Sequence, residues 1–506
     1  MSLTRRDFFK TSGLAAVALG VTASGVANAR SDSARTRPAI RWRGAPAGGD
    51  VDPALHLLRR ASFGPTRAEL RRVRAMGVDA WIEEQLAPDA IDDSRLEDRL
   101  ARRYETLAMS PSELQALDDF PHIRSELYAA TLERAVYSQR QLLQVMVDYW
   151  SNHFSVNIFN GSVRILKTVE DREVMRKQAF SPFRQMLGAD AHSPAMLIYL
   201  DNATSTSDAP NENYARELME LHTLGVDGGY TEQDVKEMAR ALTGWAVNRL
   251  TGEFLFISRR HDRGQKTLLG HVLPAGRGQE DGEEALDILA SHESTSRYVA
   301  HRLCVRFVAD DPPAGVVDAA AGVFRQTSGD IRAVLRTIFT HEDFQASAGQ
   351  KFRRPFELIG AAVRTLEIPN ARGASMSRAL FLMEQPLFAW PTPDGYPDDA
   401  ASWLNANALL GRWNIGLALT EGRDRGVQVP WENFEAELGK DASAEETVDF
   451  FTDLILHQAI HPDDRAQLLA YLLGDDDAFD ISNPEHRRRI PELAALLLDS
   501  PYFQWR

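Results

Sequence analysis

Histidine lies beside acidic or amide side chains at three places in the chain, and each grouping suits acid–base chemistry or metal binding. The three places are residues 150–157, 211–224 and 261–262. Imidazole and carboxylate groups are the usual general acids, general bases and metal ligands of enzymes. From these places we take the following as candidate catalytic residues: His153, Glu217, His222, His261 and Asp262.

Residues 212–224 are predicted to form one amphipathic helix. On a helical wheel His222 lies about 140° from Glu217, so Glu217, Glu220 and His222 cannot all reach one metal ion from this helix alone. Asn213 and Glu217 share a polar row that has no packing purpose if it is buried. Asn213 is therefore a candidate substrate-binding residue. His222 also fits a core histidine that faces the carbonyl end of its helix.

His153 follows an apolar helical stripe, and two interpretations of it remain open. It is either a base or metal ligand on the floor of a cleft, or a core histidine bonded to a backbone carbonyl. His261-Asp262 lies in a loop after a candidate strand. Adjacent histidine and aspartate suit a metal site or a base oriented by a carboxylate, and they suit a polar turn equally well. A metal ion is therefore a candidate cofactor.

The loop Trp390-Pro-Thr-Pro-Asp-Gly-Tyr396 is rich in proline and glycine, which predicts a rigid loop. Its aromatic rings could stack on sugar faces, or they could dock the loop onto the helical core. Trp390 and Tyr396 are candidate substrate-binding residues.

Helical signals dominate from Val51 onward. Capping boxes are predicted at Thr66 and Glu69 and again at Thr231 and Asp234. Strand signals are confined to residues 252–258 and 266–272, which we expect to pair as a hairpin. The predicted fold is mostly α, a large multi-helix bundle or toroid-like α domain with one small β-hairpin excursion, formed by a single domain over residues 51–506.

The first residues read as an export signal. Arg5-Arg6 forms a twin-arginine motif, residues 13–26 are apolar, and Ala27-Asn28-Ala29 is a small-x-small cleavage site. The apolar run is shorter than the roughly 20 residues of a membrane span. We therefore expect residues 1–29 to be a twin-arginine signal peptide and residues 30–50 to be a flexible linker. The mature protein is expected in the periplasm or secreted, without a membrane span.

The formal net charge of −15 argues against nucleic acid and anionic membrane surfaces as partners. Cys304 is the only cysteine, which excludes an intrachain disulfide, an iron–sulfur cluster and a multi-cysteine zinc site.

The sequence resembles the bacterial family known as domain of unknown function 1800 (DUF1800) over nearly the whole mature chain. The residues that carry the resemblance are His56–Pro65, Trp150–Asn157, Ser193–Asn202, Asn211–Trp245, His261–Gly270, Lys351–Glu357 and Trp390–Trp413. Ser151 departs from the family, in which histidine is expected there. The resemblance implies secreted bacterial proteins, often encoded beside a co-exported DUF1501-type partner, and no established activity.

Two hypotheses of function follow. The first is a hydrolase or metal-dependent enzyme that acts on an extracellular or periplasmic glycan-like polymer. The alternative is a non-catalytic binding or assembly protein for extracellular polysaccharide that works with a co-exported partner. If the first holds, His153, Glu217 and His261-Asp262 should share one pocket of about 300–1,000 Å³. Scattered side chains would favour the second.

Overall fold

The computed structural model describes residues 41–43, 51–161, 163–476 and 478–506. The predicted signal peptide, residues 1–29, and most of the predicted linker, residues 30–50, lie outside the described residues. The described residues belong to one compact unit. Within the linker range, the Arg41 amide donates to Gln467 at 2.7 Å, and the Trp42 ring packs edge-on against Tyr502.

The first third of the described chain is helical and places Trp81 and Trp150 in the buried core. Local caps set where its helices begin: the Thr66 hydroxyl accepts from the Glu69 amide at 3.1 Å. This is one half of the predicted capping box, because the Glu69 carboxylate accepts from Arg364 instead. The elements are α2 (Pro53–Ala61), α3 (Arg67–Met76), α4 (Val78–Leu86), η1 (Pro88–Ala90), α5 (Ser94–Arg103), η2 (Glu105–Ala108), α6 (Pro111–Leu117), α7 (Phe120–Tyr137) and α8 (Gln141–His153).

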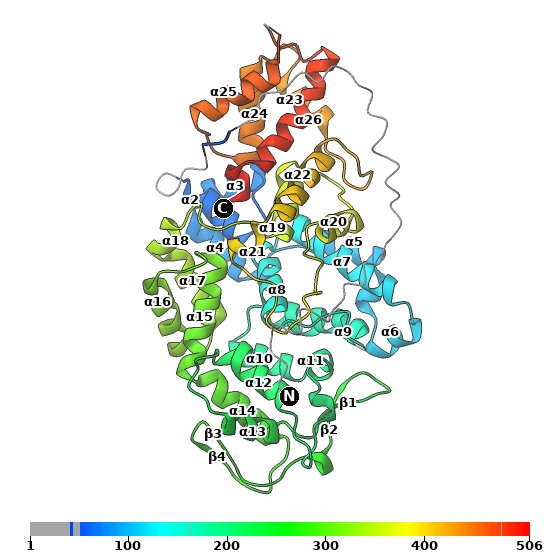
Figure 1. Ribbon diagram of the computed structural model, residues 1–506, viewed down its shortest axis with the longest axis vertical. Helices are drawn as coiled ribbons and strands as arrows, with labels where there is room; N and C mark the ends of the chain where they lie inside the picture. The colour runs from blue at the N-terminus through cyan, green and yellow to red at the C-terminus, as the bar shows by residue number, and fades with distance from the viewer. Residues whose placement is uncertain (1–40, 44–50, 162, 477) are drawn as a thin grey trace. The chain divides into compact units, whose positions relative to one another are not determined.

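The middle third contains short helices and the only strands among the described residues (Figure 1). A full capping box formed by Thr231 and Asp234 starts α13, as predicted. The helical elements are α9 (Val163–Glu170), η3 (Asp171–Arg176), α10 (Phe183–Ala191), α11 (Pro194–Tyr199), η4 (Asn202–Thr204), α12 (Glu212–Glu217), η5 (Leu218–Thr223), α13 (Glu232–Ala241), η6 (Ser258–Arg260), α14 (Glu280–Ser291) and α15 (Glu293–Phe307).

The last third returns to helices that pack on one another and on the first third; α22 packs along α26, and α20 along α7 (Figure 1). These elements are α16 (Ala314–Gln326), α17 (Ile331–Thr340), α18 (Glu342–Ala346), α19 (Pro355–Thr365), α20 (Gly373–Leu382), α21 (Ala400–Trp403), α22 (Ala406–Thr420), α23 (Trp431–Leu438), α24 (Ala444–Leu456), α25 (Pro462–Leu473), α26 (Pro484–Asp499) and α27 (Pro501–Gln504). The predicted mostly-α class is confirmed.

The β excursion consists of two hairpins rather than the predicted one. Strand β1 (Trp245–Val247) pairs antiparallel with β2 (Phe254–Phe256), and β3 (Lys266–Leu268) pairs with β4 (His271–Leu273). The predicted pairing of residues 252–258 with 266–272 is therefore wrong. The physical reason is the turn at Leu269-Gly270, where both residues have positive φ and fold the chain back at once.

The predicted helix over residues 212–224 changes its winding half-way. After Glu217 the chain continues as the π-helix η5, in which the Leu224 amide donates to the Met219 carbonyl, five residues earlier. A helical wheel of 100° per residue describes an α-helix, so it gives the wrong angle between His222 and Glu217. A second π-helix, η3, follows α9. π-helical segments are rare in proteins, and many of those that do occur lie at functional sites.

A buried ion network at the N-terminus of α19 joins distant parts of the chain. Arg354 binds Asp148 at 2.6 Å, and Arg306 binds the same carboxylate at 3.3 Å. Glu357 accepts from Arg306 and, at 2.7 Å, from Arg506. Breaking a buried pair leaves an uncompensated charge and costs about 3–5 kcal/mol. The network therefore holds α8, α15 and α19 in fixed register.

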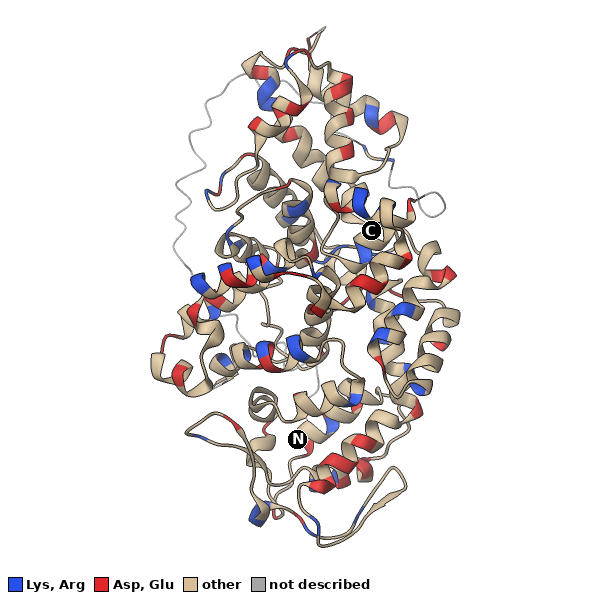
Figure 2. Ribbon diagram, turned by 180° about the vertical axis from the view of Figure 1, so that it is seen from behind, with Lys and Arg blue, Asp and Glu red and all other residues tan. Residues whose placement is uncertain are grey.

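Exposed charges of both signs are interspersed along the helices (Figure 2). Among the residues described, none of the helices combines the length and apolarity that crossing a membrane requires.

Candidate functional site

The loop that carries Trp390 and Tyr396 is fixed against the C-terminal end of α8. The Asn152 side chain donates to the Tyr396 carbonyl at 2.8 Å and accepts from the Tyr396 amide at 2.7 Å. Gly395 has φ +75°, and a Cβ on it would lie 2.2 Å from the Asn152 carbonyl oxygen. Only glycine allows this approach. Two segments far apart in sequence therefore meet here, and we call their meeting point the junction.

His153 and His222 meet at the inner side of the junction. The Nε2 atom of His153 lies 3.0 Å from the His222 carbonyl oxygen, and its Nδ1 has no partner among the described residues. His222 is fully buried, and neither of its ring nitrogens has a described partner. Burial lowers the pKa of His222 to about 3. Burial, Arg302 and His222 hold the pKa of His153 well below its usual value.

Because the pKa values of His153 and His222 are both lowered, both imidazoles are neutral at neutral pH. A catalytic acid or base works best with a pKa near the operating pH. His153 and His222 thus fit a positioning or hydrogen-bonding role better than proton transfer at neutral pH.

Tyrosine and arginine side chains of α15 complete this side of the junction. The Tyr298 ring lies 6.2 Å from the His153 ring and approaches Gly225 so closely that a Cβ there would lie 2.8 Å from it. Arg302 is partly exposed and forms no ion pair or hydrogen bond within the described part of the chain. Burial lowers the pKa of Arg302, but Tyr298, Tyr149 and nearby carboxylates outweigh it and raise the pKa overall.

Two carboxylates with different surroundings, Glu217 and Asp394, interact electrostatically with each other, and Asp394 also interacts with Arg302. We call Glu217 and Asp394 the acidic pair. Burial, Glu220 and Asp394 raise the pKa of the half-buried Glu217, although Arg216 opposes them. Asp394 is exposed, and its Oδ1 accepts from the Trp390 indole at 2.9 Å and from the Thr392 hydroxyl at 2.5 Å. One acid thus holds its proton more tightly, and the other is oriented by two donors.

His261 and Asp262 lie outside the junction and bind different partners. The His261 ring contacts the Asp281 carboxylate at 3.2 Å and the Thr243 carbonyl at 2.9 Å. Asp262 forms an ion pair with Arg240 at 2.7 Å. No contact described here joins either residue to the acidic pair, and in Figure 1 the strands β3 and β4 that follow them are well separated from α8. The expected convergence with His153 and Glu217 is therefore wrong for these two residues, because local partners satisfy both side chains.

The candidate substrate-binding residues differ in accessibility. Asn213 is exposed, and its side chain donates weakly to the Leu200 carbonyl at 3.4 Å. Trp390 is half-buried. Tyr396 is buried, and its hydroxyl donates to the Pro386 carbonyl at 2.6 Å. Trp390 and Asn213 are thus the two that a ligand can reach.

Within the described ranges, no group of three or more histidine, cysteine, aspartate or glutamate side chains is arranged to hold a metal ion. Both His261 ring nitrogens are already in use.

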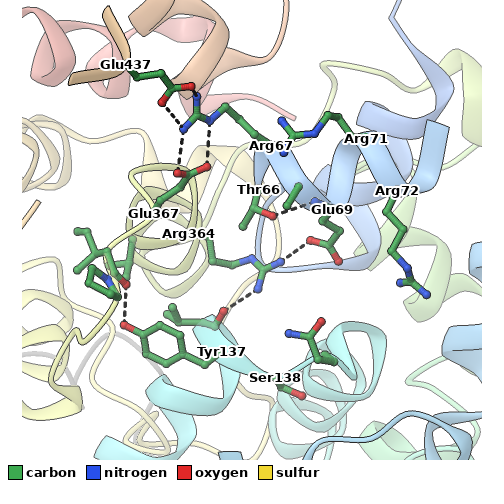
Figure 3. Close-up of a pocket in the computed structure, with 16 residues that line it drawn as sticks. Thr66, Arg67, Glu69, Arg71, Arg72, Tyr137, Ser138, Arg364, Glu367 and Glu437 are labelled. Atoms are coloured by element: carbon green, nitrogen blue, oxygen red, sulfur yellow. Dashed lines mark hydrogen bonds and ion pairs between the residues drawn. The ribbon is translucent and has the colours of Figure 1, made fainter. Parts of the chain in front are cut away.

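Cavities of ligand size lie away from the junction. A cavity lined by Asn152, Trp390 and Tyr396 measures only about 20 Å³, far less than the expected 300–1,000 Å³. Figure 3 shows residues that line a pocket at the start of α3. The volume of this pocket is about 690 Å³. Most of its charged groups are already paired: Arg67 binds Glu367 at 2.9 Å and Glu437 at 2.6 Å, and Arg364 binds Glu69 at 2.5 Å.

Comparison with known proteins places the chain in a family. A family model described as "Protein of unknown function (DUF1800)" matches residues 56–505. The chain belongs to this family. Neither the curated proteins nor the solved structures give a significant match. The DUF1800 match spans the junction, both hairpins and, except for Arg506, the ion network.

Sequence reasoning about this DUF1800 member missed Asp394, Tyr298 and Arg302. Asp394 carried a signal, because it lies between the two aromatic candidates Trp390 and Tyr396 in a rigid loop. Tyr298 and Arg302 lie one turn apart on an ordinary amphipathic helix, and nothing in that pattern indicates which face meets the junction.

Proposed function

We propose that the protein is an exported hydrolase that cleaves a glycan-like polymer at the acidic pair. The observation that carries this proposal is the raised pKa of Glu217 beside Asp394 at the junction. A pair of carboxylates, one of which holds its proton more tightly because it is partly buried beside negative charge, is the usual arrangement for glycosidic bond hydrolysis.

In the proposed mechanism, protonated Glu217 donates its proton to the oxygen of the glycosidic bond as the carbon–oxygen bond breaks. Asp394 either activates the attacking water or attacks the sugar carbon itself, after which water releases the sugar. Overall, one water molecule adds across one bond. The Trp390 indole, held by Asp394, offers a ring face against which a sugar can stack.

The exposure of the site supports a polymeric substrate. Asp394 is exposed and Glu217 is only half-buried, so a long chain can lie across the pair without having to enter an enclosed pocket. Enclosed cavities of about 300–1,000 Å³ are typical of small-molecule sites. Export by the twin-arginine route, expected from Arg5-Arg6, brings the enzyme to such polymers outside the cytoplasm.

Two observations favour a second function, a non-catalytic binding or assembly protein for extracellular polysaccharide that works with a DUF1501-type partner. The first is that His261 and Asp262 bind local partners outside the junction, the scattering that this function predicts. The second concerns the cavities. The described cavities of ligand size, among them the pocket in Figure 3, do not contain the acidic pair. In that case the protein holds polymer without cleaving it.

Turnover by variants of the acidic pair tests the proposal. Exported protein is incubated with xylan, laminarin, chitosan and peptidoglycan, and newly formed reducing ends are measured. Glu217→Gln should lower kcat by about 10²–10⁴-fold on whichever polymer is cleaved, because the proton donor is lost. Glu212→Gln, on the same helix, serves as the control and should keep full activity. Binding of a polymer without any release of reducing ends would support the second function.

A further inference from the structure

A groove of about 1,000 Å³ lies beside the β1–β2 hairpin, away from the acidic pair. Its walls come from the hairpin, from α6, α9 and α11, and from the segment after α11. This volume is at the upper end of the range for ligand sites in proteins. The lining residues are Pro111, Gln115, Ile165, Leu166, Ile198, Ala203, Thr204, Thr206, Val247, Asn248, Arg249, Gly252, Leu255, Ile257 and Arg260.

The apolar part of the lining is aliphatic. Ile198, Leu255 and Ile257 are each only half-buried, so they present accessible aliphatic surface to the groove. None of the lining residues is aromatic. Sugar faces are usually bound by stacking on aromatic rings, as proposed for Trp390. An aliphatic wall instead gains free energy by covering hydrocarbon.

The charge of the lining is positive in an acidic protein. Arg249 and Arg260 line the groove, and no aspartate or glutamate does, although the whole chain carries a formal net charge of −15. In the described residues neither arginine side chain forms an ion pair or hydrogen bond. Guanidinium groups bind carboxylates through paired hydrogen bonds. The groove therefore complements an anion.

The other polar residues of the lining suit the charged head of an anionic ligand. Thr206 and Asn248 bring a hydroxyl and an amide group that donate hydrogen bonds to oxygen. Donors and arginines together with an aliphatic wall match a molecule with one charged end and one hydrocarbon end.

We infer that this groove is a binding site for a single-chain amphiphile with an aliphatic tail and one carboxylate head, a free fatty acid. The tail lies against Ile198, Leu255 and Ile257, and the carboxylate binds Arg249 and Arg260. The site is separate from the acidic pair, so it stands whether or not the protein cleaves glycans.

Fluorescence of cis-parinaric acid, an unsaturated fatty acid that brightens in apolar sites, tests the inference on the whole exported protein. Wild type should bind the probe, and palmitate should displace it. Hexadecanol, which has the tail but no charge, should compete on the order of tenfold less well, because tenfold corresponds to about 1.4 kcal/mol and a charged hydrogen bond is worth at least that. Hexadecyltrimethylammonium should compete less well still.

Two charge variants and one matched control locate the site. Arg260→Gln and Arg249→Gln should each weaken palmitate binding about tenfold. Arg259→Gln is the control, since Arg259 is exposed, adjacent in sequence and not part of the lining. Circular dichroism confirms folding of each variant, and Arg249 lies in an exposed hairpin turn where a substitution leaves the core intact.

Three outcomes would overturn the inference. The first is equal binding of palmitate and hexadecanol. The second is unchanged binding in both arginine variants. The third is binding to phosphatidylglycerol vesicles without binding of free palmitate, which would indicate a membrane surface as the partner. None of these touches the hydrolase proposal, whose test uses Glu217→Gln and reducing ends.

Discussion

The Nε2 atom of His153 lies 3.0 Å from the carbonyl oxygen of His222, a residue 69 positions later in the chain. The bond ties the last turn of α8 to the π-helix η5. It satisfies a backbone carbonyl that the π-helix would otherwise leave in an apolar interior. One ring nitrogen of His153 therefore has a structural use.

For His153→Gln we expect a folded protein that is less stable by about 1–3 kcal/mol, because the amide replaces the imidazole with imperfect geometry in a buried place. Polymer turnover should change little, since a neutral imidazole at this depth transfers no proton at neutral pH. Chemical denaturation and reducing-end release measure the two quantities. Loss of turnover in a stable variant would instead assign His153 to the reacting groups.

His222→Phe gives the opposite expectation. Both ring nitrogens of His222 are buried without a described partner, and replacing unsatisfied polar atoms by an apolar ring of similar shape is close to neutral or stabilising. The free energy of unfolding should stay within about 1 kcal/mol of wild type or rise. A loss of more than 2 kcal/mol would mean that these nitrogens bind a partner, such as an internal water.

The parts of this fold that local sequence determines were predictable. The hydroxyl caps at Thr66 and Thr231 are both present, and the full capping box with an acid three residues on is formed at Thr231. The change to a π-helix after Glu217 was not predictable from period alone, since the added residue per turn depends on what the segment packs against.

The same distinction separates the two parts of the site. Trp390 and Glu217 could be named because their segments hold more polar and aromatic groups than packing needs. Arg302 could not, since an arginine on an amphipathic helix is typical of a solvent-facing side. Only the packing of α15 on η5, with the Tyr298 ring beside His153 of α8, brings it near Asp394. The two hairpins were mispaired because alternation identifies a strand and leaves its partner open.

Export offers a prediction that is independent of the site. Replacing Arg5 and Arg6 together by lysine should leave uncleaved precursor in the cytoplasm, because the twin-arginine route requires the pair. Immunoblots of cytoplasmic and periplasmic fractions measure this. Arg35→Lys, after the expected cleavage site, should export normally. Processing of the double variant at the wild-type level would contradict the route.

Glu220 gives a prediction about pH. Its charge is one cause of the raised pKa of Glu217, after burial. Glu220→Gln should lower the pKa of Glu217, so activity that needs protonated Glu217 should fall at lower pH than in wild type. We expect the basic limb of the kcat profile to move down by a few tenths of a unit to about one unit, and less in 1 M salt. Glu212→Gln should leave the limb unmoved. An unmoved limb in Glu220→Gln would remove Glu217 from the role of proton donor.

The acidic side chain of Asp499 makes stability depend on pH. It lies against α22, and a Cβ on Gly416 would lie 2.6 Å from its Oδ1. Burial raises the pKa of this carboxyl from 3.8 to about 8. Between these two values the folded state binds more protons than the unfolded state, so this group makes the protein less stable as pH rises from about 4 to about 8.

Asp499→Asn should remove that dependence, because the amide stays neutral at every pH in the window. At pH 8 the variant should be more stable than wild type, on the order of 1–3 kcal/mol, since wild type must either bury a charge or pull the side chain toward water. Near pH 4 the two proteins should unfold alike, because Asp499 is protonated in the folded wild type. Urea unfolding of both proteins at pH 4, 6 and 8 measures the difference. A variant with the same gain at all three values would show that packing, rather than ionisation, accounts for the effect.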